Sequence, residues 1–222
     1  MRFNTEGLFI KVSGVTSEED ALFAIGLGAS AVGFEFGPTP RKISTAAAHD
    51  IVRRLPNGAV SVGVFHNEMP QRIVEVANTL GLTAVQIDGA ITNSSLVYVA
   101  ERVNTVIRSI PSGRELLEDS TANGIDYYLL PETDDFDSLV ECLEVFQDFS
   151  IRTPLIASGG LNPSNVIDIV QNYPVWGVDV RGGVEIEAGV KDPVLLGEFI
   201  ANARWAHDNA YVQRRTDGWP II

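Results

Sequence analysis

Eight short apolar segments alternate with longer amphipathic segments along nearly the whole chain. The apolar segments are rich in Val, Ile and Phe and lie at residues 8–12, 31–36, 59–65, 84–87, 105–110, 127–130, 154–157 and 177–180. Their starts are roughly 21–28 residues apart, which leaves room for the helical crossover that joins two parallel strands. Because these segments are almost continuously apolar, they are typical of parallel strands buried on both faces.

The segments between these strands carry the signals of helices. Ser17 precedes a run of acidic residues, and Pro70 and Pro163 stand where a first helical turn tolerates proline. The predicted helices cover residues 17–27, 45–55, 70–80, 94–101, 113–122, 135–146, 163–171 and 192–206. Eight alternations favour a barrel over a doubly wound open sheet. We therefore predict a single-domain α/β protein, a (β/α)8 TIM barrel over residues 1–206, followed by a C-terminal tail at residues 207–222.

The excess of acidic residues argues against some classes of binding partner. The chain has 16 Lys and Arg against 29 Asp and Glu, a formal net charge of −13. Such a surface repels nucleic acids and anionic membranes, and no apolar segment reaches the length of a membrane span. The N-terminal residues lack the pattern of a secretory signal, which favours a cytoplasmic protein. With one cysteine, Cys142, and three dispersed histidines, the sequence predicts neither a disulfide nor a metal site.

Two glycine pairs follow the last two predicted strands. Gly159 and Gly160 come after the seventh strand, and Gly182 and Gly183 come after the eighth, beside Arg181. Glycines let backbone N–H groups approach a ligand closely, and these two loops commonly bind phosphate in barrels of this kind. The pattern predicts a site for a small-molecule anion, with Arg181 adding a charge-assisted bond. Alternatively, each glycine pair only forms a tight turn, and Arg181 is ion-paired within the protein or solvated.

Charged residues at other strand ends suggest further chemistry. Arg41 follows the proline-stiffened GPTP segment and can hold a carboxylate, or else it is an exposed loop residue. Asp88 ends the fourth strand and Glu35 interrupts an apolar one, so a raised pKa would suit either to proton transfer. The alternatives are an Asp that caps a turn and a Glu in an ion pair. Asp179 is expected to anchor a turn.

Six segments in order carry a family resemblance. KVSGVTSEEDA, GFEFGPTPRKIS, VGVFHNE, TAVQIDG, LIASGGLNPSNV and GVDVRGGVEIEAGVKD resemble the motifs KICGLTxxEDA, GFxFxxxSPRxxS, VGVFVNE, DAVQLHG, LAGGLxPxNV and GVDVSSGVExxxGxKD of phosphoribosylanthranilate isomerases of tryptophan biosynthesis. The resemblance covers about residues 9–203. It implies a (β/α)8 barrel that needs no cofactor and converts an aminoaldose phosphate to an aminoketose phosphate by general acid–base chemistry.

The sequence departs from the family pattern at the proton-transfer positions. The family's basic Cys is Ser13 here, and its acidic Asp is Pro131. The family's His in QLHG is Asp88, and its last loop has Ser-Ser where this chain has Arg181-Gly182. Arg41 matches the family's arginine on the anthranilate side. By their positions, Asp88 is the candidate to replace the family's base, and Glu132, next to Pro131, is the candidate to replace its acid.

Three functions therefore remain open. The first is a diverged enzyme that uses Asp88, with Glu35 or Glu132 and Ser13, for acid–base chemistry on a phosphorylated or carboxylated molecule. The second is a non-catalytic ligand-binding or regulatory barrel, favoured by Pro131 and Ser13. The third is a genuine phosphoribosylanthranilate isomerase with substituted catalytic groups. The expected partner is a small-molecule anion, a sugar phosphate or a carboxylate. Nucleic acid and membrane are not expected partners. A homodimer formed through the tail stays an open alternative.

Overall fold

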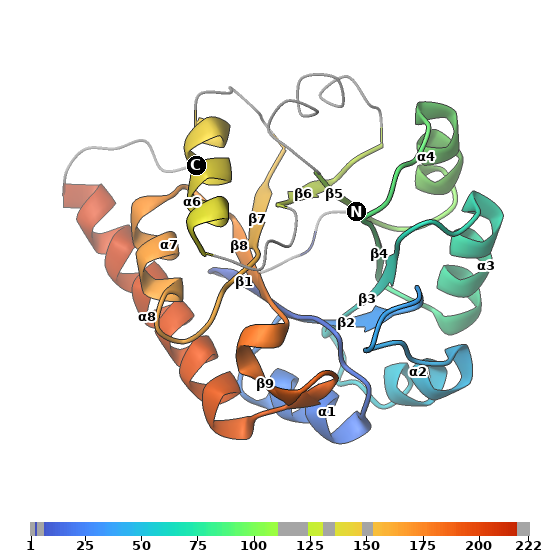
Figure 1. Cartoon of the computed structure of the whole chain (residues 1–222), viewed down its shortest axis with the longest axis horizontal. Helices are drawn as coiled ribbons and strands as arrows, with labels where there is room; N and C mark the ends of the chain where they lie inside the picture. The colour runs from blue at the N-terminus through green and yellow to red at the C-terminus, as the bar shows by residue number, and fades with distance from the viewer. Residues whose placement is uncertain (1–2, 4–6, 111–123, 131–135, 148–152, 217–222) are drawn as a thin grey trace.

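The computed structural model describes residue 3 and residues 7–110, 124–130, 136–147 and 153–216, and for residues 147 and 211–216 it describes the backbone alone. Eight parallel strands form a closed barrel in which each strand pairs with the next and the last pairs with the first (Figure 1). The strands are β1 (Phe9–Val12), β2 (Ala31–Glu35), β3 (Val60–Phe65), β4 (Ala84–Ile87), β5 (Val106–Ser109), β6 (Tyr127–Leu129), β7 (Leu155–Ser158) and β8 (Gly177–Val180). The predicted (β/α)8 barrel is confirmed.

Helices surround this barrel (Figure 1). They are α1 (Glu18–Gly26), α2 (Thr45–Val52), α3 (Pro70–Leu80), α4 (Asn93–Ala100), α6 (Phe136–Gln147), α7 (Val166–Asn172) and α8 (Pro193–Thr216). The helix predicted at residues 113–122 lies outside the described residues. After β8 the chain forms a single 3₁₀ turn, η1 (Gly182–Val184), and a short antiparallel pair, β9 (Glu185–Glu187) and β10 (Val190–Lys191), which the sequence analysis did not predict.

Local side-chain bonds explain where several helices begin. Ser17 caps α1 by accepting a hydrogen bond from the N–H of Asp20, and Pro70 opens α3 in its first turn. Helix α7 was predicted from Pro163 but starts at Val166. The side chain of Asn162 accepts the N–H of Ser164 at 2.8 Å, so the residues before α7 form a turn in place of a first helical turn.

The last helix is longer than its sequence pattern predicted. Helix α8 continues past residue 206 to Thr216, so the expected boundary between barrel and tail falls inside a helix. Ala203, Ala206 and Ala210 are buried at helical spacing and extend the packed face of α8 into the segment predicted as tail. A separate role for the end of the chain stays a prediction.

Aromatic side chains close the N-terminal end of the barrel. Phe9 begins β1, Tyr127 begins β6 and Trp176 immediately precedes β8, and the ring of Phe3 stacks on those of Phe9 and Tyr127 with centroids 5.3 and 4.9 Å apart. The N–H of Phe3 also donates a 2.8 Å hydrogen bond to the Tyr127 hydroxyl. This packing seals one end of the barrel, so the polar interior side chains gather at the other end.

No helix in the described part of the chain is long and apolar enough to cross a membrane.

The contact between β1 and β8 leaves no room for a side chain at Gly177. A Cβ at this position would lie 2.7 Å from the Phe9 carbonyl oxygen, on the two strands that close the barrel. We expect Gly177→Ala to lower the free energy of unfolding by about 1–3 kcal/mol through overpacking. Urea unfolding followed by circular dichroism measures the change.

Gly26→Ala is the matched control. Gly26 ends α1, and a Cβ there would meet nothing within 4 Å. This substitution is expected to be neutral or to stabilise the helix by up to about 1 kcal/mol. Equal stabilities for the two variants would contradict the tight β1–β8 contact.

Candidate active site

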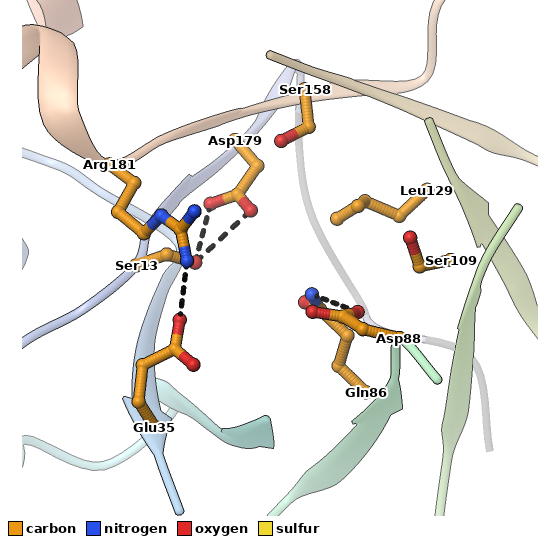
Figure 2. A pocket seen from close by; sticks show the side chains of 9 residues that line it. All are labelled: Ser13, Glu35, Gln86, Asp88, Ser109, Leu129, Ser158, Asp179 and Arg181. Carbon is orange, nitrogen blue, oxygen red and sulfur yellow. Dashed lines mark hydrogen bonds and ion pairs between the residues drawn. The ribbon is translucent and has the colours of Figure 1, made fainter. Parts of the chain in front are cut away.

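The C-terminal ends of the strands surround a polar cavity. Figure 2 shows Ser13, Glu35, Asp179 and Arg181 on one side and Gln86, Asp88 and Ser109 on the other. The remaining lining residues are Leu129 and Ser158. The structure thus brings together four residues that the sequence analysis singled out as chemical candidates: Ser13, Glu35, Asp88 and Arg181.

A buried ion pair between Lys11 and Asp179 holds the side chain of Ser13 by hydrogen bonds. Strands β1 and β8 pair in a register that sets Lys11 beside Asp179, and the Lys11 Nζ lies 2.8 Å from Asp179 Oδ2. Ser13 Oγ donates to Asp179 Oδ1 at 2.8 Å and accepts a hydrogen bond from Lys11 Nζ. Burial raises the pKa of Asp179, while Lys11 and the Ser13 hydroxyl offset part of that rise. The expectation that Asp179 anchors a turn was wrong, because it binds two side chains of β1.

Glu35 is the centre of a second charged group. Its Oε1 lies 3.1 Å from an Arg181 nitrogen, and its Oε2 lies 3.0 Å from His66 Nε2. Burial acts to raise the pKa of Glu35, but the bonds from His66 and Arg181 outweigh it and leave the pKa lowered. The expectation of a raised pKa was therefore wrong for Glu35, and the ion-pair alternative is confirmed. Arg181 is ion-paired in the same contact.

Asp88 ends β4 on the opposite side of the cavity. Its Oδ1 accepts a 2.7 Å hydrogen bond from Gln86 Nε2, and its Oδ2 lies 3.9 Å from His66 Nδ1. Burial raises the pKa of Asp88, against the lowering effects of Gln86 and His66, in line with the sequence-based expectation. The other amide atom, Gln86 Oε1, is buried and has no hydrogen-bond partner among the described residues.

The two glycine loops lie against each other. A Cβ on Gly183 would lie 2.0 Å from the Leu161 carbonyl oxygen, so the loop after β8 touches the loop after β7 directly. Gly159 and Gly160 have φ angles of 103° and 58°, a left-handed conformation that favours glycine. The structure therefore places both predicted anion-binding loops in one wall, with Arg181 leading into the second.

Arg41 is engaged within the protein. Its guanidinium donates to Glu185 in a two-pronged contact, with Nε to Oε2 at 2.9 Å and the terminal nitrogen to the same oxygen at 2.7 Å. Glu185 also accepts Lys191 Nζ at 2.7 Å. These bonds oppose the effect of burial and lower the pKa of Glu185. Arg41 lies next to Gly14 and Gly182, and its side chain is only 18% exposed, so the alternative of an exposed loop residue was wrong.

The sequence analysis missed part of this site. It gave no site role to Lys11, Glu185 or Lys191, and it counted His66 only among three dispersed histidines. The available signal was a charged residue inside an otherwise apolar segment, such as Lys11 in LFIKV and Asp179 in GVDV. Glu132, a predicted acid, lies outside the described residues, and so does Pro131. The described residues contain no cluster of His, Cys, Asp and Glu that fits a metal ion.

Comparison with known proteins decides the family. A family model for N-(5'-phosphoribosyl)anthranilate (PRA) isomerase matches residues 10–202. The chain belongs to the phosphoribosylanthranilate isomerase family. A relative from Thermotoga neapolitana with that name is 36% identical in an alignment of 207 residues, and the match covers 88% of this chain and 98% of the relative.

Solved structures of the family agree with the fold. Phosphoribosylanthranilate isomerase from Thermotoga maritima superposes with a TM-score of 0.79 at 34% identity and covers 89% of this chain and 99% of its own. A family structure in complex with reduced 1-(o-carboxyphenylamino)-1-deoxyribulose 5-phosphate has a TM-score of 0.77 at 35% identity, with the same coverage. The family resemblance of the sequence motifs is thus confirmed.

The Lys11–Asp179 pair should be essential for stability. Lys11→Met would leave Asp179 buried without its cationic partner, which costs about 3–5 kcal/mol when a buried pair is broken. We expect urea unfolding at neutral pH to show a loss of this size. The control is Lys42→Met at an exposed position, which should change the free energy of unfolding by less than about 0.5 kcal/mol. Similar values for the two variants would show that the pair does not hold the two strands.

Proposed function

We propose that this protein is an enzyme that performs acid–base chemistry on a small phosphorylated or carboxylated molecule at the C-terminal ends of the strands. The observation that carries the proposal is the arrangement in Figure 2, where Ser13 and Asp88 face one cavity from opposite sides. An isomerisation that takes a proton from one atom and gives a proton to another needs two such groups around one substrate.

Asp88 is the proposed proton acceptor. Its side chain is 22% exposed, so a substrate can reach it. Burial makes it a stronger base than an ordinary carboxylate, while the donor group of Gln86 and the adjacent His66 favour its ionised form. This combination suits removal of a proton from carbon next to an imine or carbonyl group.

Ser13 is the proposed second proton-transfer group. A serine hydroxyl alone is a weak acid and a weak base, but here it is bonded to a buried ammonium group and a buried carboxylate. When Ser13 gives its proton to a substrate oxygen, Lys11 can replace it. When Ser13 takes up a proton, its own can pass to Asp179. Glu132 keeps its proposed role as an acid next to the family's acidic position.

The proposed anion site is the wall formed by the loops after β7 and β8. Gly159, Gly160, Gly182 and Gly183 would supply backbone N–H groups, and Arg181 would supply positive charge. Arg41 would meet a ligand carboxylate with the edge of its guanidinium that Glu185 leaves open. The ligand of the solved relative, a carboxyphenylamino deoxyribulose phosphate, has both kinds of anionic group, which supports this arrangement.

The family match favours a specific substrate as the first one to test. Phosphoribosylanthranilate has a phosphate, a carboxylate and an aminoaldose that isomerises by proton transfer, and the closely matching relatives bear the name of that isomerase. A homodimer is part of the proposal as well, because a structure of the Thermotoga maritima relative is described as monomers made from a dimeric enzyme.

The direct test is incubation with phosphoribosylanthranilate while its fluorescence is followed. We expect turnover by the natural protein and a loss of about 10²–10⁴-fold in kcat/KM for Asp88→Asn, because the amide cannot accept the proton. Asp50→Asn, on the exposed side of α2, is the matched control and should keep full activity. Equal rates for the two variants would remove Asp88 from the chemistry. Failure of the natural protein to turn over this substrate, or aldose phosphates in general, would favour the non-catalytic alternative.

The anion site has a separate test that needs no turnover. Ribose 5-phosphate should raise the melting temperature, since a ligand that binds only the folded state stabilises it. Arg181→Gln should weaken this binding about tenfold or more, because a charge-assisted bond is lost. Arg54→Gln, which removes an exposed arginine paired with Glu18, should leave the affinity unchanged. The same affinity in both variants would exclude Arg181 from the anion site.

A further inference from the structure

His66 lies at a position where this chain differs from the family motifs. The family motifs have Val at this position and His at the end of the next strand, whereas this chain has His66 after β3 and Asp88 after β4. Strands β3 and β4 are paired neighbours, with Phe65 opposite Ile87, so residues 66 and 88 emerge side by side. A histidine is therefore still present at this edge of the barrel, but it comes from the adjacent strand.

Both nitrogens of the His66 ring face carboxylates. Nε2 lies 3.0 Å from Glu35 Oε2, and Nδ1 lies 3.9 Å from Asp88 Oδ2. A neutral imidazole has one N–H and would turn an acceptor toward one of these carboxylates, whereas an imidazolium has two N–H groups and suits both. The hydrogen bond to Glu35 is the main reason that the pKa of His66 is raised, which agrees with the charged form.

Two glycines hold the imidazole in this position. A Cβ on Gly37 would lie 2.3 Å from the Cδ2 atom of the His66 ring, and a Cβ on Gly89 would lie 1.6 Å from the His66 carbonyl oxygen. The N–H of His66 donates to Glu68 Oε2 at 2.7 Å. The loops after β2, β3 and β4 thus lie in close contact with the ring and backbone of His66.

We infer that His66 is a positioning residue for Asp88: held as an imidazolium by Glu35, it orients the Asp88 carboxylate toward the cavity and keeps it ionised. The inference rests on the proposed function in one respect, the role of Asp88 as proton acceptor. The bridge that His66 forms between Glu35 and Asp88 is itself a property of the ligand-free protein. It gives this chain a charged link between β2, β3 and β4 that the family motifs, with Val at this position, do not encode.

Other charges near the bridge define what a titration will report. Glu35 also pairs with Arg181 from the loop after β8, and Glu68 approaches His66 from its own loop. Asp88 is influenced by His66, by Glu35 and by Lys11 of β1. Since His66 acts to lower the pKa of Asp88 against the effect of burial, removal of the imidazolium should raise the pKa of Asp88 further.

The test is an NMR titration of the ligand-free protein, with ¹⁵N-labelled histidine and ¹³C-labelled aspartate side chains. We expect the midpoint of His66 to lie above the ordinary histidine value, and the midpoint of Asp88 to move to higher pH in His66→Gln. His49→Gln is the matched control, because His49 lies in α2 away from the cavity lining, and it should leave Asp88 unchanged. Asp88→Asn should lower the midpoint of His66.

A second variant keeps the test decisive if His66→Gln does not fold. Gly37→Ala retains the imidazole but displaces it from Glu35, so it should lower the His66 midpoint and raise that of Asp88. An Asp88 midpoint that is the same in the natural protein and in either variant would overturn the inference. So would a His66 that is neutral throughout the neutral pH range.

The kinetic consequence separates this inference from the proposed function. If the protein turns over its substrate, the acidic limb of kcat/KM should move to higher pH in His66→Gln, in parallel with the Asp88 titration. An unmoved limb together with a shifted Asp88 midpoint would confirm the bridge and refute the role of Asp88 as base. A shifted midpoint in a protein without turnover would leave the bridge standing and remove the proposed enzyme function.

Discussion

The pairing of β1 with β8 is the constraint on which the rest of the site depends. It closes the barrel and sets Lys11 beside Asp179 in its interior. Charges buried this deeply persist only when they are paired and hydrogen-bonded, and here the Ser13 hydroxyl completes the group. The aromatic packing of Phe3, Phe9, Tyr127 and Trp176 seals the other end of the barrel. The polar cavity therefore lies at the opposite end, among the C-terminal ends of the strands.

Positive and negative groups are paired around this cavity. Asp179 pairs with Lys11, Glu35 pairs with Arg181 and His66, and Glu185 pairs with Arg41 and Lys191. Glu35 and Glu185 are held ionised by cations from other strands or loops, whose direct bonds outweigh the effect of burial and lower both pKa values. Asp179 and Asp88 differ from these glutamates, because burial outweighs the compensating contacts and leaves the pKa of each raised. For Asp88, the direct hydrogen bond comes from the neutral amide of Gln86.

The sequence predicts the barrel better than it predicts the site. Strands such as β4 and β8 have the bounds expected from their apolar runs, because hydrophobic periodicity is a local property. The end of α8 was missed because its packed positions beyond residue 203 are small alanines in a polar segment. The Lys11–Asp179 pair joins residues 168 positions apart, and only barrel closure brings them together. The same holds for Arg41 and Glu185, which the sequence shows as two unrelated loop residues.

Ser13 and Pro131 stand where the family resemblance implies a Cys and an Asp, yet the cavity keeps groups suited to proton transfer. A barrel that only had to be stable would gain from apolar side chains in place of buried Lys11, Glu35 and Asp179, since desolvation of charges is costly. The cavity instead keeps a hydroxyl on a buried ion pair at one side and a carboxylate with a raised pKa at the other. Strongly perturbed groups in a cleft are typical of active sites. In the proposed mechanism, Asp88 is the base at the position where the family motif has an imidazole, and His66 on the adjacent strand lies where it can hold that carboxylate in place.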